Sequence, residues 1–154
     1  MKTLCLSLLT LALFAEGPPS IVVWPAAELH RFEKTLAPKM TAEKVAVQQL
    51  EQFGNHRTMI AHREGSGQAE LHDTEADLFV VQSGTATLVT GGKIAGAKEE
   101  SPGEIRGTSI EGGAKRKLAA GDIVHIPAKT PHQLLLDSGH QFTYFVLKVK
   151  VDTH

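Results

Sequence analysis

The chain has 154 residues, of which 42% are apolar and 21% are charged, and its formal net charge is −1. This length fits one domain that can bury a core without disulfides. The sequence pI is about 6.7 and no basic patch stands out, so nucleic acid is not an expected partner.

The first 15 residues have the pattern of a secretory signal peptide. Lys2 gives a positive start, an apolar run follows over residues 4–14, and Ala15 precedes a polar stretch. The run is too short to cross a bilayer as a helix, so we expect a secreted or periplasmic protein with no membrane attachment after signal removal. The alternative is a buried N-terminal helix. Cleavage would remove Cys5, the only cysteine, and would leave nitrogen and oxygen as the metal ligands.

Residues 16–44 form an N-terminal arm in this interpretation. A short β-rich stretch covers residues 20–24. Pro25 then opens a helical pattern over residues 26–36, with apolar side chains on one stripe, and Pro38 ends it.

The remaining residues, 45–154, have the pattern of an all-β domain, either a sandwich or a closed barrel. Ser83-Gly84 resembles the turn of a hairpin. Residues 91–117 contain few large aliphatic side chains, so we expect an inserted flap there, with a partly disordered loop as the alternative. The predicted strands are residues 45–50, 57–62, 69–72, 78–81, 85–90, 123–126, 133–136 and 142–151.

Two short stretches supply a candidate metal pocket. Glu70 and His72 alternate along one strand and share a face, and Asp77 leads the next strand. An inward carboxylate on an apolar face is costly unless it is paired, hydrogen-bonded or bound to a metal. His132 begins a later strand and is expected to face the interior. The alternative for the two carboxylates is a solvated acidic turn.

These residues resemble the two motifs of the cupin family. In the first motif, Glu70 and His72 stand at His-x-His, Asp77 stands at the glutamate, and Gly84 closes the motif. The second motif is GDIVHIPAKTPH over residues 121–132, and it is the more specific of the two. Three positions depart from the family pattern: Glu70 replaces a histidine, Lys129 replaces a glycine, and Leu136 replaces the usual asparagine.

The resemblance implies a single small cupin-like β-barrel, or jelly roll, with a short N-terminal helix. It also implies a homodimer, and the β-rich residues 21–23 could add a strand to an open sheet edge. Carried over residue by residue, the metal ligands are Glu70, His72, Asp77 and His132. This set suits Mn²⁺ or Fe²⁺, with Zn²⁺ as a further candidate, and a site that has lost its metal is the alternative. The expected pocket-lining residues are His62, Phe79, Val81, Leu134 and Tyr144.

The function expected from the sequence is that of an exported cupin-domain protein that binds a divalent metal and binds or transforms a small organic molecule. Dioxygenases, isomerases and lyases all occur in the family, so the fold does not fix a reaction. Two alternatives stay open. One is a metal-free cupin that binds a sugar or an organic acid, and the other is a structural domain with a vestigial pocket.

Overall fold

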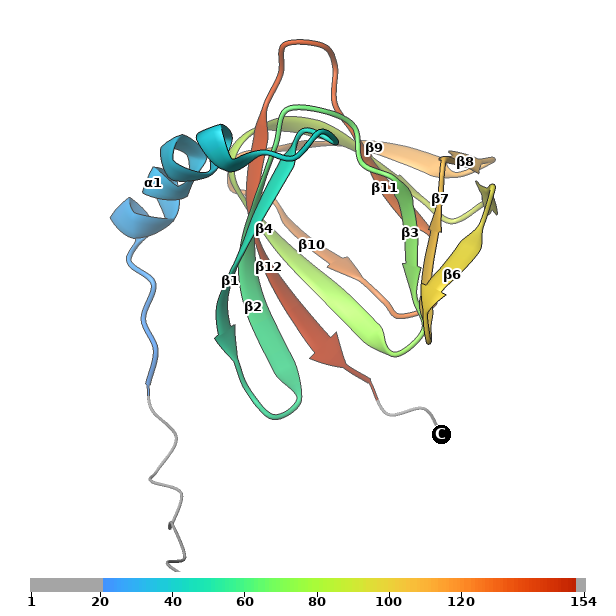
Figure 1. Ribbon diagram of the computed structural model, residues 1–154, viewed down its shortest axis with the longest axis horizontal. Helices are drawn as coiled ribbons and strands as arrows, with labels where there is room; N and C mark the ends of the chain where they lie inside the picture. The colour runs from blue at the N-terminus through green and yellow to red at the C-terminus, as the bar shows by residue number, and fades with distance from the viewer. Residues whose placement is uncertain (1–20, 152–154) are drawn as a thin grey trace, which may run out of the picture.

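Residues 21–151 are described by the computed structural model, in which a ten-stranded sheet curls into a barrel (Figure 1). A small two-stranded sheet and one α-helix complete the structure. The pairings between neighbouring strands are antiparallel. The predicted all-β barrel with a short N-terminal helix is therefore confirmed. The predicted signal peptide, residues 1–15, lies outside the described residues.

The helical elements are α1 (Ala26–Leu36) and the 3₁₀ turn η1 (Ala37–Lys39). Helix α1 begins and ends where the sequence predicts, directly after Pro25. The strands are β1 (Val45–Gln52), β2 (His56–Arg63), β3 (Ala69–His72), β4 (Glu75–Thr90), β5 (Lys93–Ala95), β6 (Lys98–Ser101), β7 (Glu104–Gly107), β8 (Ser109–Glu111), β9 (Ala114–Ala119), β10 (Ile123–Ile126), β11 (His132–Leu135) and β12 (Phe142–Lys150).

Strand β4 pairs with four other strands of the barrel. Its first half pairs with β10 and β12, and its second half pairs with β9 and β11. The predicted hairpin at Ser83-Gly84 is wrong, because β4 runs through this point as one strand of 16 residues. Gly84 has a φ of 78°, and a Cβ built on it would lie 1.9 Å from the carbonyl oxygen of Gln141. The glycine therefore serves a bend inside a strand, beside a register shift in β12.

Residues 91–117 are more regular than the expected flap. They form β5 to β8 and most of β9. Strand β7 pairs with β3, and β9 pairs with β4, so this segment extends the barrel sheet itself. Its short strands are separated by glycines with positive φ, such as Gly96 and Gly103. These interruptions leave no long apolar run in the sequence, so the pattern did not predict the strands.

The two faces of the curled sheet bury different cores. The barrel interior holds an apolar cluster that includes Phe79, Leu134, Phe142 and Tyr144. On the outer face, helix α1 packs against β1 and β2 and covers a second cluster built on Leu36, Ala46 and Ile60. Alternate residues of β2 thus serve opposite cores, as expected for a strand buried on both sides.

The N-terminal stretch before helix α1 is not a strand in the structure. Residues 21–25 have no assigned secondary structure, and Ile21 and Val23 are 93% and 72% exposed. The aromatic ring of Trp24 contacts that of Phe145 at a centroid distance of 5.5 Å. Within residues 21–151, no helix is long and apolar enough to cross a membrane.

Candidate metal centre

Three strands bring the four predicted ligands together inside the barrel. Strand β3 supplies Glu70 and His72 from one face, as strand alternation requires. Asp77 enters from β4, on the face that also carries Phe79. His132 begins β11 and stands directly opposite Glu70 in the strand register. The two sequence motifs therefore meet, and the rings of His72 and His132 lie 5.2 Å apart between centroids.

The potential ligand atoms of these residues are closely spaced. The Nε2 atom of His72 lies 3.6 Å from a Glu70 carboxylate oxygen and 3.5 Å from an Asp77 oxygen. The Nε2 atom of His132 lies 3.9 Å and 3.6 Å from the same two oxygens. One ligand atom each from Glu70, His72 and His132 lies within 4.8 Å of the other two. All of these atoms face one small volume.

Both imidazoles are oriented by a hydrogen bond on the far side of the ring. His72 Nδ1 lies 2.7 Å from a Glu104 carboxylate oxygen, and His132 Nδ1 lies 3.0 Å from the Thr130 carbonyl oxygen. Because each acceptor takes a proton from Nδ1, each Nε2 is turned toward the shared volume. Metal-binding histidines usually have such a partner on the second ring nitrogen.

This donor set fits a divalent metal ion. Two ligand atoms bound to one ion through bonds of about 2.0–2.2 Å lie no more than about 4.4 Å apart. The four nitrogen-to-oxygen separations range from 3.5 to 3.9 Å and satisfy this limit. Two imidazole nitrogens with two carboxylate oxygens suit Mn²⁺, Fe²⁺ or Zn²⁺. The side chains of His72, Asp77 and His132 are at most 5% exposed, so a bound ion would be largely shielded from water.

Positively charged side chains surround the carboxylates, and the sequence did not predict this. Lys148 Nζ lies 2.6 Å from Asp77 Oδ1 and 2.8 Å from His72 Nε2. Arg106 Nη1 lies 2.9 Å from the Glu70 carboxylate, and Arg63 lies 3.7 Å from it. The alternation along β12 could have predicted that Lys148 points inward. The inward residues of this strand are Phe142, Tyr144, Val146 and then Lys148.

These contacts shift the protonation equilibria of the pocket. Burial alone would raise the pKa of Glu70, but the hydrogen bond with His72 and the Arg106 guanidinium lower it to about 2. Burial likewise opposes ionisation of Asp77, yet His72 and Lys148 keep its pKa below the ordinary value. Burial lowers the pKa of His132. His132 is therefore a neutral imidazole at neutral pH, which is the form that binds metals.

His72 has the opposite tendency. Burial disfavours its charged form, but the Asp77 and Glu70 carboxylates outweigh burial and raise its pKa to about 9. The short contact between His72 Nε2 and Lys148 Nζ allows only one proton on the line joining the two nitrogens.

The space beside the ligand cluster is small. A cavity of about 20 Å³ lies next to Glu70 and His132, enough for about one water molecule. Phe79, Leu134 and Tyr144 line it, whereas Val81 packs in the apolar core. The Tyr144 hydroxyl accepts a hydrogen bond from Arg63 Nε at 3.0 Å.

A wider cleft of about 480 Å³ opens on the other side of the same wall. Three side chains, those of Arg63, Gln68 and Glu70, line both the cleft and the small inner cavity. The Arg63 side chain is only 12% exposed and packs over Gly67. The cleft therefore borders the candidate metal site at Arg63 and Glu70.

The structure corrects the expectation that His62 lines the pocket. His62 is fully buried but belongs to the outer face of β2, the face that carries Ile60. Its Nδ1 atom lies 2.8 Å from the Thr143 hydroxyl, and its Nε2 atom lies 3.4 Å from Glu64. The alternation of β2 places Ala61 and Arg63 inward instead. The sequence prediction assigned His62 to the wrong face of the strand, which corresponds to a shift of one residue.

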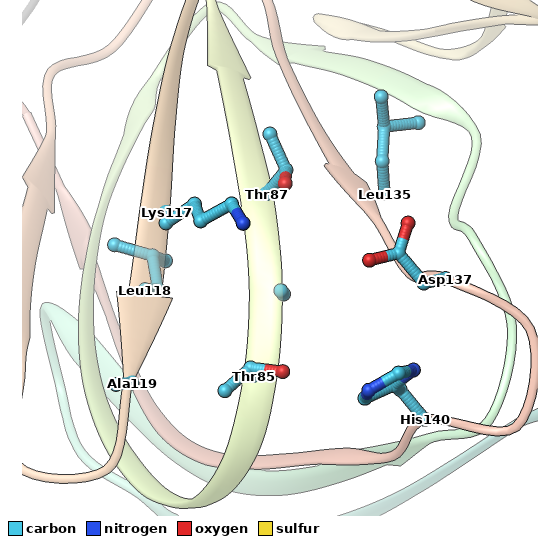
Figure 2. A pocket seen from close by; sticks show the side chains of 9 residues that line it. Thr85, Thr87, Lys117, Leu118, Ala119, Leu135, Asp137 and His140 are labelled. Atoms are coloured by element: carbon cyan, nitrogen blue, oxygen red, sulfur yellow. The ribbon is translucent and has the colours of Figure 1, made fainter.

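Another hollow, of about 280 Å³, lies beside β4, β9 and the loop between β11 and β12. Figure 2 shows Asp137 and His140 on the loop side of this hollow, across from Thr85 and Thr87. Asp137 and His140 are exposed, as is Lys117 on the opposite wall. These side chains are therefore solvated, in contrast to the buried groups of the candidate metal site.

Comparison with known proteins places the fold. No protein-family model matches the sequence, and no curated protein matches it. A protein from Bacillus halodurans has a similar structure, with a TM-score of 0.59 and 13% identity over 90% of this chain and 87% of that one. A Cupin 2 conserved barrel domain protein from Salinispora arenicola gives a TM-score of 0.50 and 18% identity, over 71% of this chain and 78% of that one.

The DMSP lyase DddQ from Ruegeria pomeroyi also gives a TM-score of 0.50 with 18% identity, over 72% of this chain but only 50% of that one. At this level of identity the similarity concerns the fold. The chain has the fold of the cupin-type barrel proteins, and the buried Glu/His/His group of this barrel is a candidate metal site.

Proposed function

We propose that the protein binds one divalent metal ion through Glu70, His72, Asp77 and His132, and that it receives a small organic ligand from the adjoining cleft. The observation that carries the proposal is the set of four separations between the two Nε2 atoms and the Glu70 and Asp77 carboxylate oxygens, which range from 3.5 to 3.9 Å across three different strands. Strands β3, β4 and β11 hold these atoms in place, and Glu104 and Thr130 orient both imidazoles.

A metal ion held there would act as a Lewis acid on an oxygen of the ligand or would activate a small molecule such as oxygen. The protein's own groups have separate tasks. Glu70 belongs both to the ligand cluster and to the cleft wall, and Arg63 beside it offers a positive charge to an anionic ligand. Tyr144, Phe79 and Leu134 limit the inner space and keep bulk water out.

The proposal includes the setting expected from the sequence. The N-terminal pattern supports export, to the periplasm or the cell exterior, and the family resemblance supports a homodimer. Both features are independent of the metal and would be tested separately, by mass spectrometry of the N-terminus of the exported protein and by light scattering.

The metal proposal is tested on protein purified without an affinity histidine tag. We expect about one equivalent of Mn, Fe or Zn by elemental analysis, or saturable binding of one equivalent of Mn²⁺ after chelation. His132→Ala should abolish this binding. His125→Ala is the matched control, because His125 lies in the neighbouring strand β10 but is exposed.

A metal-free ligand-binding protein is the second candidate, and one observation favours it. The carboxylates of Glu70, Asp77 and Glu104 lie near three cationic side chains, Arg63, Arg106 and Lys148. The cluster is therefore close to neutral without a metal. Absence of binding to Mn²⁺, Fe²⁺ and Zn²⁺ by the intact protein would contradict the first proposal and leave this one.

A further inference from the structure

Lys148 is the cation that contacts two of the proposed metal ligands directly. It is an inward residue of β12, where Asp77 is its register partner on β4. Its side chain is 12% exposed, and Nζ lies 2.6 Å from Asp77 Oδ1 and 2.8 Å from His72 Nε2. A lysine amine thus lies within hydrogen-bond distance of both residues.

The contact with His72 excludes simultaneous metal binding at that nitrogen. An imidazole ring nitrogen offers one lone pair in the ring plane. The Nδ1 atom of His72 donates its proton to Glu104, which leaves Nε2 as the metal-facing atom. In the 2.8 Å contact, a single proton lies between Nε2 and Lys148 Nζ. Whichever nitrogen owns that proton, the lone pair of Nε2 is not available to a metal.

The charge of the cluster leads to the same conclusion. Asp77 is 2% exposed and would be costly as an unpaired carboxylate, so the metal-free fold needs a cation beside it. Lys148 supplies this cation. A divalent ion on the same ligands would supply it instead, and the ammonium would then face a like charge in a buried pocket.

We infer that Lys148 is an internal competitor of the metal ion: its amine occupies the ligand set in the metal-free protein and withdraws from His72 when the ion binds. This inference rests on the proposed metal-binding function. Lys148 keeps the empty site paired and stable, and it lowers the affinity for the ion because the two occupants exclude one another.

The test compares Mn²⁺ affinity in the intact protein and in Lys148→Met, by equilibrium dialysis or by the EPR signal of free Mn²⁺. We expect the substitution to tighten binding on the order of 10- to 100-fold. Lys148→Gln, which keeps an uncharged donor near Asp77, is the second variant in case Lys148→Met does not fold. Lys150→Met is the matched control, because Lys150 is on the same strand but exposed, and it should leave the affinity unchanged.

Unchanged or weaker Mn²⁺ binding in both Lys148 variants would overturn the inference and leave the metal site standing. If neither the intact protein nor the variants bind Mn²⁺, Fe²⁺ or Zn²⁺, the metal proposal itself is wrong, and the inference about Lys148 is wrong as well. The unmodified protein offers an independent measurement. Reductive methylation of Lys148, followed by mass spectrometry, should rise several-fold on Mn²⁺ saturation relative to Lys150, and a constant level would contradict the displacement.

Discussion

The interior of the barrel is filled in two different ways along the same pair of strands. Strands β4 and β12 are register partners over most of their length. In one half of the pair, Phe79 stands opposite Val146, and the neighbouring inward side chains are also apolar. In the other half, Asp77 stands opposite Lys148, next to the two histidines. The change from one kind of filling to the other takes two residues.

The difference bears on where the proposed function lies. The apolar half gains stability from burial alone, at about 25 cal/mol for each Å² removed from water. The charged half gains little from burial, because each carboxylate must be paired before it can be buried. A fold under pressure for stability alone would extend the apolar filling. The charged half has instead the convergent ligand atoms, so we assign the chemistry of the molecule to it.

The largest expected effect comes from breaking the Asp77–Lys148 pair. Asp77→Leu leaves the Lys148 ammonium in a pocket where its side chain is 12% exposed. Such a change costs about 3 kcal/mol of unfolding free energy. The double variant Asp77→Leu with Lys148→Met continues the apolar filling of the other half. We expect it to recover most of that loss, since hydrophobic residues often replace a buried pair at no cost. Urea unfolding in the presence of a chelator measures both.

A double variant as unstable as Asp77→Leu would contradict this account of the charged half. It would mean that the surrounding groups, and not the ion pair, determine the cost. Both variants should also fail to bind Mn²⁺ with the affinity of the intact protein, because each lacks the Asp77 ligand. This second measurement separates the stability of the pair from its role in the proposed site.

A smaller effect is expected from the pH dependence of the charged half. The pKa of Glu70 in the folded protein is about 2, below its ordinary value of 4.5. A lowered carboxyl pKa contributes stability that is present above pH 4.5 and is lost as the pH falls toward 2. Glu70 is 22% exposed, so we expect about 2 kcal/mol after allowing for solvent screening.

Glu70→Gln isolates this contribution in metal-free protein. At pH 6 the variant should be less stable than the intact protein by that amount, and the gap should narrow by about half as the pH falls to 3, since it is lost fully only below the folded-state pKa of about 2. His72 has the opposite sign, since its pKa is raised to about 9 and its contribution is lost as the pH rises through that value. A gap between the two proteins that stays constant from pH 6 to 3 would show that the charge of Glu70 does not stabilise the fold.

Much of the fold followed from the sequence because strand alternation and turn residues are local signals. Helix α1 has the predicted bounds, and the strands beside the site lie where apolar alternation placed them. The predicted hairpin at Gly84 failed for a physical reason. A glycine with positive φ serves equally in a turn and in a bend of a continuous strand, and only the nearby Gln141 carbonyl distinguishes the two.

The candidate site was only partly predictable. Glu70, His72, Asp77 and His132 do lie together, because each stands at a strand position whose face the alternation fixes. The cations around them were not predicted. Arg106 comes from β7, within a segment that showed no apolar pattern, and its proximity to Glu70 depends on the pairing of β3 with β7. Local sequence patterns do not predict which distant strands pair with one another.

The smallest expected effect concerns the turn that joins the two halves of the second motif. Lys129 stands where the cupin motif that the sequence resembles has a glycine, and its φ is 61°, in the left-handed region. Its amide donates a 2.7 Å hydrogen bond to the carbonyl of His72, so this backbone conformation connects the turn to the candidate metal site. The Lys129 side chain is exposed, so the left-handed backbone costs about 1 kcal/mol with no visible compensation from packing.

Lys129→Gly should therefore stabilise the protein by about 0.5 kcal/mol, the remainder being offset by the added flexibility of the unfolded chain. Lys129→Ala, which removes the same charge but keeps a Cβ, should give no such gain in thermal unfolding. Equal stabilities of the two variants would show that the turn is unstrained, and that glycine at this place serves something other than backbone conformation.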